Sequence, residues 1–178
     1  MVVLVTVLAM HRTRGALTAL VVMLLDAGTA VAASSPSSFA VSASVVAECA
    51  ITTTPLSFGA YDPIVANKTA PLDATGSVTI TCTQGAAPTI GLDPGTNGAF
   101  ATGTTRAMKT GSNYLSYEIY QNSGRTTVWG NAGGGLLTPA AAPSFAPRAF
   151  TIYGRIPAGR DVPAGSLYTD TVRATVNF

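Results

Sequence analysis

The chain closes on Tyr168-Thr-Asp-Thr-Val-Arg-Ala-Thr-Val-Asn-Phe178 (YTDTVRATVNF), its clearest run of strict alternation. Every second residue, from Tyr168 through Val172 to Phe178, belongs to one side of the run. The other side is occupied by threonines, Arg173 and Asn177. Successive side chains of a β-strand point to opposite faces, so this pattern predicts a strand with one face against a core.

The same two-residue period recurs upstream in short runs. Their inward-facing residues are Phe39, Val41, Ala43 and Val45; Val78, Ile80 and Cys82; Leu115, Tyr117 and Ile119; and Phe150, Ile152 and Gly154. The chain has 18 glycines and 11 prolines, which are spread between these runs. Many short strands with turn residues between them predict an all-β sandwich. The least regular stretch, 131–147, is interpreted as one long surface loop.

Residues 1–33 are interpreted as a secretory signal peptide. Gly15–Leu25 is an apolar run, too short for the roughly 20 residues that cross a bilayer, and Arg12 and Arg14 precede it. The small residues Ala30–Ala33 suit cleavage after Ala32 or Ala33, and Met1 and Met10 are both possible starts. A short membrane anchor is the alternative. We expect no membrane span in the exported chain from Ser34 onward.

Charge and cysteine usage narrow the function classes. The net charge of the full chain is only +2, so electrostatics indicates no nucleic-acid or membrane-surface partner. Charged residues are 10% of the chain, against about 25% in typical soluble domains, which favours a protein packed against neighbours. The two cysteines, Cys49 and Cys82, both follow the leader, and an oxidising compartment favours a disulfide between them.

The residues after the leader offer little support for a catalytic site. The one histidine, His11, lies in the leader, so no Ser-His-Asp or Cys-His arrangement and no ordinary zinc site is expected in the exported chain. We therefore predict no catalytic, cofactor-binding or metal-binding residues, and no enzyme. The seven carboxylates after the leader are interpreted as turn and surface groups: Glu48, Asp62, Asp73, Asp93, Glu118, Asp161 and Asp170. Asp62-Pro63 and Asp93-Pro94-Gly95 are turn sequences.

Taken in order, short motifs spread over residues 39–178 resemble the spore coat protein U domain family, which includes subunits of archaic (Csu-type) chaperone–usher pili. The motifs are Phe39–Val45 followed by Cys49, Leu56–Asp62, Thr79–Thr83, Arg106–Met108, Leu115–Tyr120, Trp129-Gly130, Tyr153–Gly159, and Tyr168–Val172 with Thr175–Phe178. Each motif alone is weak, and the shared order with a single cysteine pair makes the resemblance specific.

The resemblance implies an incomplete immunoglobulin-like β-sandwich of the pilin type. Its final strand is missing, and donor-strand complementation completes it. Residues 34–48 would be the N-terminal extension and 49–178 the sandwich. The expected donor-strand residues are Phe39, Val41, Ala43 and Val45, with Ala43 entering a shallow pocket. The expected groove wall, which would also pair with a chaperone, is formed by Val172, Ala174, Val176 and Phe178.

The resemblance also implies a function and partners. The chain would be a structural subunit of a surface pilus or fibre that serves adhesion and biofilm formation, as a shaft, adaptor or minor subunit. It would be exported through the periplasm to the cell surface. Its partners would be other copies or sister pilus subunits, a periplasmic chaperone and an outer-membrane usher.

Several alternatives remain open from sequence. Residues 39–45 could be an ordinary first strand of their own sheet, and the C-terminal run a plain core strand. The whole chain could be a structural spore-coat protein, or a self-contained secreted binding module that uses the 131–147 loop. The remaining alternative is a hydrolase that uses two of the seven carboxylates.

Overall fold

A computed structural model describes residues 31–165 and 167–178. The predicted signal peptide therefore lies almost entirely outside the described residues and stays a prediction. Residues 43–178 form one compact unit. No helix in the described part of the chain is long and apolar enough to cross a bilayer.

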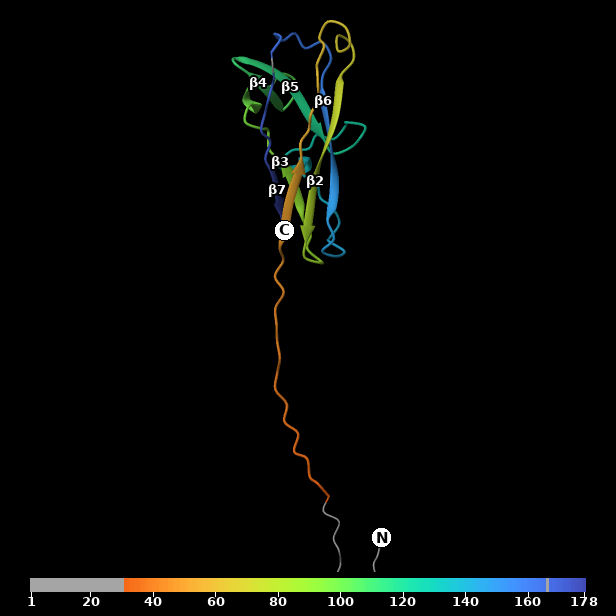
Figure 1. Ribbon diagram of the computed structural model, residues 1–178, viewed down its shortest axis with the longest axis vertical. Helices are drawn as coiled ribbons and strands as arrows, with labels where there is room; N and C mark the ends of the chain where they lie inside the picture. The colour runs from red at the N-terminus through yellow and green to blue at the C-terminus, as the bar shows by residue number, and fades with distance from the viewer. Residues whose placement is uncertain (1–30, 166) are drawn as a thin grey trace, which may run out of the picture. The chain divides into compact units, whose positions relative to one another are not determined.

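The compact unit is built from strands and two short 3₁₀ turns, which confirms the all-β prediction (Figure 1). The strands are β1 (Cys49–Thr54), β2 (Leu72–Cys82), β3 (Thr89–Leu92), β4 (Arg106–Thr110), β5 (Asn113–Tyr120), β6 (Arg148–Ile156) and β7 (Ala174–Asn177). The 3₁₀ turns η1 and η2 span Gly98–Phe100 and Gly133–Gly135. One sheet has the order β1-β2-β6-β5-β4, and the other pairs β3 with β7. Every pairing is antiparallel.

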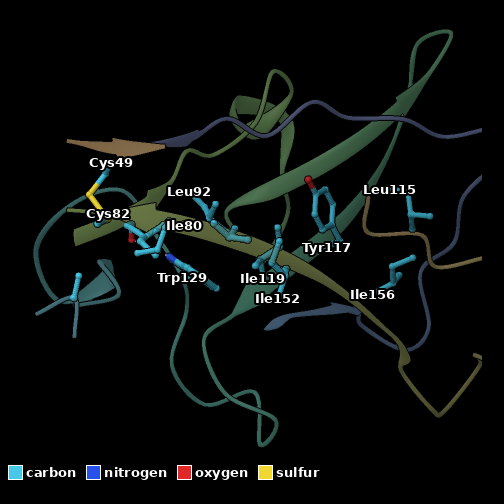
Figure 2. Close-up of a cluster of buried hydrophobic side chains, with 13 residues drawn as sticks. Cys49, Ile80, Cys82, Leu92, Leu115, Tyr117, Ile119, Trp129, Ile152 and Ile156 are labelled. Carbon is cyan, nitrogen blue, oxygen red and sulfur yellow. Dashed lines mark hydrogen bonds between the residues drawn. A yellow bond between two sulfur atoms is a disulfide. The ribbon is translucent and has the colours of Figure 1, made fainter. Parts of the chain in front are cut away.

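The core lies where the inward faces of the two sheets meet, and Figure 2 shows its side chains. Val78 and Ile80 of β2 are fully buried, and Cys82 is nearly so. Leu115, Tyr117 and Ile119 of β5 are also buried. The predicted inward-facing residues of β2 and β5 are therefore buried, and those of β2 alternate with partly exposed residues. The Trp129 ring lies in the same cluster, and its indole N–H donates to the carbonyl of Ile90 at 3.0 Å.

The second face of β5 departs from the prediction. Ser116 and Glu118 are buried, although the alternation placed them on the solvent side. The loop that follows η1 covers them, because the backbone N–H of Thr102 donates to Ser116 and that of Thr105 donates to Glu118, both at 2.8 Å. The interpretation of Glu118 as a surface carboxylate is wrong. Asp62 and Asp93 do cap turns as predicted, accepting from backbone N–H groups within their own turns.

Glu118 belongs to a buried ion pair with Arg106, whose Nη1 lies 2.7 Å from Oε1. The guanidinium also donates to the carbonyl oxygens of Leu92, Asp93 and Trp129. These contacts join β4 and β5 to the end of β3 in the other sheet. Because the charges and most of their hydrogen-bonding positions are matched, the pair holds the two sheets in one arrangement.

Residues 131–147 contain no strand and are mostly exposed, as predicted for a surface loop, but they are hydrogen-bonded to the segment that contains β3. Leu137 and Ile90 of β3 exchange two backbone hydrogen bonds, of 2.8 and 3.0 Å. Further along, the N–H of Ala142 donates to the carbonyl of Ala86, and the Ala142 side chain is buried. The segment therefore covers the edge of β3 that β7 does not use. No local pattern in this Gly- and Ala-rich stretch signals the pairing, because the partner strand is distant in sequence.

Replacing Glu118 with alanine leaves the Arg106 guanidinium buried without its counter-ion. We expect the free energy of unfolding to fall by about 3–5 kcal/mol in urea denaturation. The matched control is Asp73→Ala, which breaks the partly exposed pairs of Asp73 with Arg155 and Arg125 and costs about 1 kcal/mol or less. Equal losses in the two variants would contradict a structural role for the buried pair.

Candidate functional site

The compact unit carries a long groove of about 970 Å³ that opens onto its core. One wall is formed by residues 53–61, which include the end of β1 and the segment after it. The other wall is formed by residues 162–165 and 167–172, which precede β7, and by Ala174 of β7. The floor consists of core side chains from both sheets: Leu92, Met108, Leu115, Tyr117, Ile119, Ile152 and Ile156. All of these floor side chains except Met108 are buried, so the groove lies directly over the core.

The first wall is held in place by side chains. Leu56 and Phe58 pack over Gly154 of β6, where an added Cβ would come within 2.7 Å of the Leu56 side chain and 2.8 Å of Phe58. The Phe58 ring also meets the ring of Tyr117 edge-on, with 5.9 Å between centroids. In the described structure, residues 55–60 form no main-chain hydrogen bond with another strand. Gly154 therefore permits the close approach that makes this wall.

The second wall is hydrogen-bonded along one edge. Thr169 exchanges backbone hydrogen bonds with Lys109 of β4, and the carbonyls of Thr171 and Arg173 accept from Thr96 and Asp93. Thr175 then continues the ladder opposite Gly91 of β3. The odd-numbered residues of the segment thus direct their backbone groups to the body of the domain. The even-numbered side chains, from Tyr168 to Val176, are half-buried, as the alternation predicts.

The opposite edge of the same segment is open. In an antiparallel ladder, alternate residues direct both backbone groups to the same neighbour, so Asp170 and Val172 direct theirs away from β3 and β4. Among the described residues, neither has a main-chain hydrogen-bond partner. The groove therefore combines an apolar lining with a free strand edge, which is the arrangement that accepts an additional strand.

A polar cluster lies at one point of this groove. The Tyr117 hydroxyl donates to Oδ2 of Asp170 at 2.8 Å. Oδ1 of Asp170 accepts from Thr96 Oγ1 at 2.8 Å and from both nitrogens of Asn97. Burial, and then the hydrogen bond to Asp170, raise the pKa of Tyr117. Asp170 is the single charged residue among the described groove residues, and its oxygens are already engaged.

The predicted disulfide is present and joins Cys49, the first residue of β1, to Cys82, the last residue of β2. The two residues face each other directly in the β1–β2 ladder. Since β1 pairs only with β2 in its sheet, the disulfide holds this edge strand at one end. The first wall of the groove continues from the other end of β1.

The predicted donor residues lie in an extension without assigned secondary structure, from Ser34 to Glu48. Phe39, Val41 and Val45 are 87%, 83% and 85% exposed, and Ala43 is exposed as well. Four apolar or small side chains on one face of an exposed segment are available for another surface. Their donor role stays a prediction.

The predicted wall residues divide into two pairs. Val172 and Ala174 line the groove. Val176 is half-buried against the core and Phe178 is about half exposed, and neither is among the described groove residues. Their pairing with a chaperone stays a prediction. The sequence analysis assigned no role to Leu56 and Phe58, although their two-residue spacing was an available signal for a strand-like wall.

Removing the disulfide with the double substitution Cys49→Ala and Cys82→Ala frees a loop of 33 residues in the unfolded chain. We expect the free energy of unfolding to fall by about 3–4 kcal/mol, because the unfolded state gains entropy. Urea denaturation measures the loss, and reductant should bring the wild-type protein to the same value. A loss below about 1 kcal/mol would argue that the ladder alone holds β1.

The raised pKa of Tyr117 predicts a loss of stability in alkali. Below pH 10, the tyrosine is protonated in both states and its contribution is fully present. Above that pH the unfolded chain loses the proton while the folded phenol keeps it, so the free energy of unfolding falls. In Tyr117→Phe, denaturation between pH 9 and pH 11 should show a shallower fall. Identical slopes in the two proteins would contradict the assignment.

Comparisons with known proteins agree with this geometry. The family model described as Spore Coat Protein U domain matches residues 35–175. Protein U of Myxococcus xanthus is 35% identical over 136 residues, which cover 69% of this chain and 71% of that protein.

A solved structure has a similar fold. It is the CsuC–CsuE pre-assembly complex of a chaperone and a tip adhesion subunit, from the archaic chaperone–usher Csu pili of Acinetobacter baumannii. The TM-score is 0.53 at 23% identity, over 75% of this chain and 40% of that chain. This chain therefore spans two fifths of the length of the solved one, and the likeness confirms the pilin-type fold. With its family model matched over nearly all of the described residues, the chain belongs to the Spore Coat Protein U domain family.

Proposed function

We propose that this chain is a structural subunit of a surface fibre that a chaperone–usher system assembles, and that it polymerises by donor-strand exchange. The observation that carries the proposal is the groove: its floor is the core itself, and one of its walls is a strand edge whose backbone groups at Asp170 and Val172 lack main-chain partners among the described residues. A strand inserted there would complete the sandwich.

The exposed extension of another subunit supplies a suitable strand. It carries Phe39, Val41, Ala43 and Val45 on one face and no charged residue between Ser34 and Ala47. Burial of these side chains stabilises the contact by several kcal/mol, at roughly 25 cal/mol per Å² of apolar surface. The backbone ladder adds hydrogen bonds along the inserted strand, as in other examples of β-augmentation.

The same groove explains the need for a chaperone. A free strand edge beside an apolar groove favours aggregation before assembly. A periplasmic chaperone that pairs with the segment from Val172 to Phe178 would cover both features until the next subunit arrives. An outer-membrane usher would then place the subunits at the cell surface, where the fibre would serve adhesion and biofilm formation.

A spore-coat layer is the second candidate function. The family description and the 35% identity to Protein U favour it. The self-contained binding module loses its main support, since residues 137–142 pair with the segment from Gly85 to Ile90 and do not form a free recognition loop.

The test compares SDS gels of protein sheared from a host that carries the chaperone and usher. Unheated full-length protein should give a ladder of multiples that collapses to one band on boiling, because each subunit holds a neighbour's strand. Deletion of residues 39–46 should leave protein that is soluble with its chaperone and runs only as a monomer.

The matched control changes the other face of the extension. The double substitution Ser42→Asn and Ser44→Asn should leave the ladder unchanged, since these side chains would face outward from the inserted strand. A normal ladder from the deleted chain, or a monomer band from the full-length chain in unheated samples, would rule out donor-strand exchange.

A further inference from the structure

The outer face of the five-stranded sheet, on the side away from the core, carries a pair of tyrosines. Tyr120 at the end of β5 lies directly opposite Tyr153 of β6, so the two side chains are neighbours on one face. Gly154 of β6 has the opposite orientation and meets the first wall of the groove. Both tyrosines are partly exposed, although the loop from Thr102 to Thr105 covers Glu118 on the same face. The pair therefore presents aromatic surface that belongs to neither the walls nor the floor of the groove.

Two arginines and one aspartate lie beside the tyrosines. Asp73 of β2 is opposite Arg155 of β6, and its carboxylate accepts from Arg155 Nε at 2.7 Å and from Nη2 at 2.9 Å. Nη1 of Arg125 lies 3.2 Å from the same carboxylate, so two positive charges share one negative charge. Among the described residues, Arg125 Nη2 and Arg155 Nη1 have no hydrogen-bond partner. Both can donate to a further acidic group.

Arg125 reaches this face through an unusual backbone conformation. In the described part of the chain it is the one residue other than glycine with a positive φ, at 52°. A residue with a Cβ rarely adopts this left-handed conformation, whereas glycine adopts it without strain. The guanidinium lies 5.8 Å from the centroid of the Tyr153 ring, and its Nε donates to the carbonyl of Gly154 at 3.2 Å. A simple chain reversal would favour glycine at this position, so the contacts of the side chain account for the arginine.

The rest of the outer face of β1, β2 and β6 offers hydroxyl groups in place of large apolar side chains. Its members include Thr52, Thr54, Thr75, Thr79 and Thr151. A protein partner would need aromatic anchors within an apolar, desolvated centre, which this face does not provide. A sugar places the flat side of its ring against an aromatic ring and forms hydrogen bonds through its hydroxyl groups. Tyrosines flanked by hydroxyls and arginines therefore fit a saccharide chain.

We propose that the tyrosine–arginine face, made of Tyr120, Tyr153, Arg125, Arg155 and Asp73, binds an acidic polysaccharide. Sugar rings lie against the two tyrosines, and a uronic-acid carboxylate accepts hydrogen bonds from the free donors of Arg125 and Arg155. The excess of one positive charge complements that carboxylate. The full chain has a net charge of only +2, which is little for binding a nucleic acid. A fibre whose grooves are all filled still presents one such site per subunit, which raises its avidity for a polymer.

The test measures retention of the exported full-length protein on beads that carry alginate, a polymer of uronic acids, with neutral dextran beads as the reference. We expect retention on alginate and none on dextran. Tyr153→Ala and Arg125→Gly should each lower the apparent affinity by about tenfold, through loss of a stacking ring or of a charged donor. Arg125→Gly should also leave the urea midpoint unchanged or raised, because glycine adopts the φ of 52° without strain. The matched control, Lys109→Gln, removes one positive charge from β4 and should bind like wild type.

The contrary outcomes differ from one another. Absence of retention on alginate, or an equal loss in Lys109→Gln and Arg125→Gly, would overturn the proposal, the second result by showing only general attraction between charges. A lowered urea midpoint in Arg125→Gly with unchanged alginate binding would give Arg125 a purely structural role. Stronger retention on single-stranded DNA that depends equally on Tyr153 would assign the face to nucleic acid. Where Tyr153→Ala lowers the urea midpoint, Tyr120→Ala tests the second ring.

The polysaccharide site and the proposed fibre assembly fail separately. The chain that lacks residues 39–46 keeps the whole tyrosine–arginine face and should still be retained on alginate. Loss of the SDS-resistant ladder with retention intact refutes donor-strand exchange alone. A normal ladder without retention refutes the polysaccharide site alone.

Discussion

One constraint governs the rest of the structure: the segment from Thr169 to Asn177 is hydrogen-bonded along only one edge. Its odd-numbered residues bind β3 and β4, while Asp170 and Val172 direct their backbone groups toward a groove that opens on the core. A sandwich normally closes this position with a strand of its own. Here the half-buried state of Met108, Val172 and Ala174 shows that the apolar surface is only partly removed from water. The proposed function depends on this free edge.

An open core requires rigid support elsewhere, and two features provide it. The Arg106–Glu118 pair, with three backbone carbonyls as further acceptors, joins the sheets beneath the groove. The disulfide holds β1, which is an edge strand on the groove side. These contacts hold β1, β3, β4 and β5 together.

Two features that the sequence analysis did not predict have a common physical cause. Glu118 lies on the opposite face of β5 from Leu115, Tyr117 and Ile119, as the alternation predicts. The loop from Thr102 to Thr105 covers that face, so Glu118 is buried and not exposed to solvent. Residues 131–147 contain the turn residues of a loop, and nonetheless Leu137 pairs with Ile90. In both cases the deciding contact comes from residues far away in sequence, which a local pattern does not include.

The sequence by itself determined the strands of the core, the cysteine pair and the alternation of the C-terminal segment. A two-residue period is set by neighbouring residues, and export alone favours a disulfide between two cysteines. It also provided the order of motifs that resembles the family. Only the tertiary structure decided which faces are covered, where Leu56 and Phe58 form a wall, and that the edge at Asp170 and Val172 is left free. The physical reason is that alternation states which side chains turn inward, whereas a free edge depends on which strands come to lie beside each other.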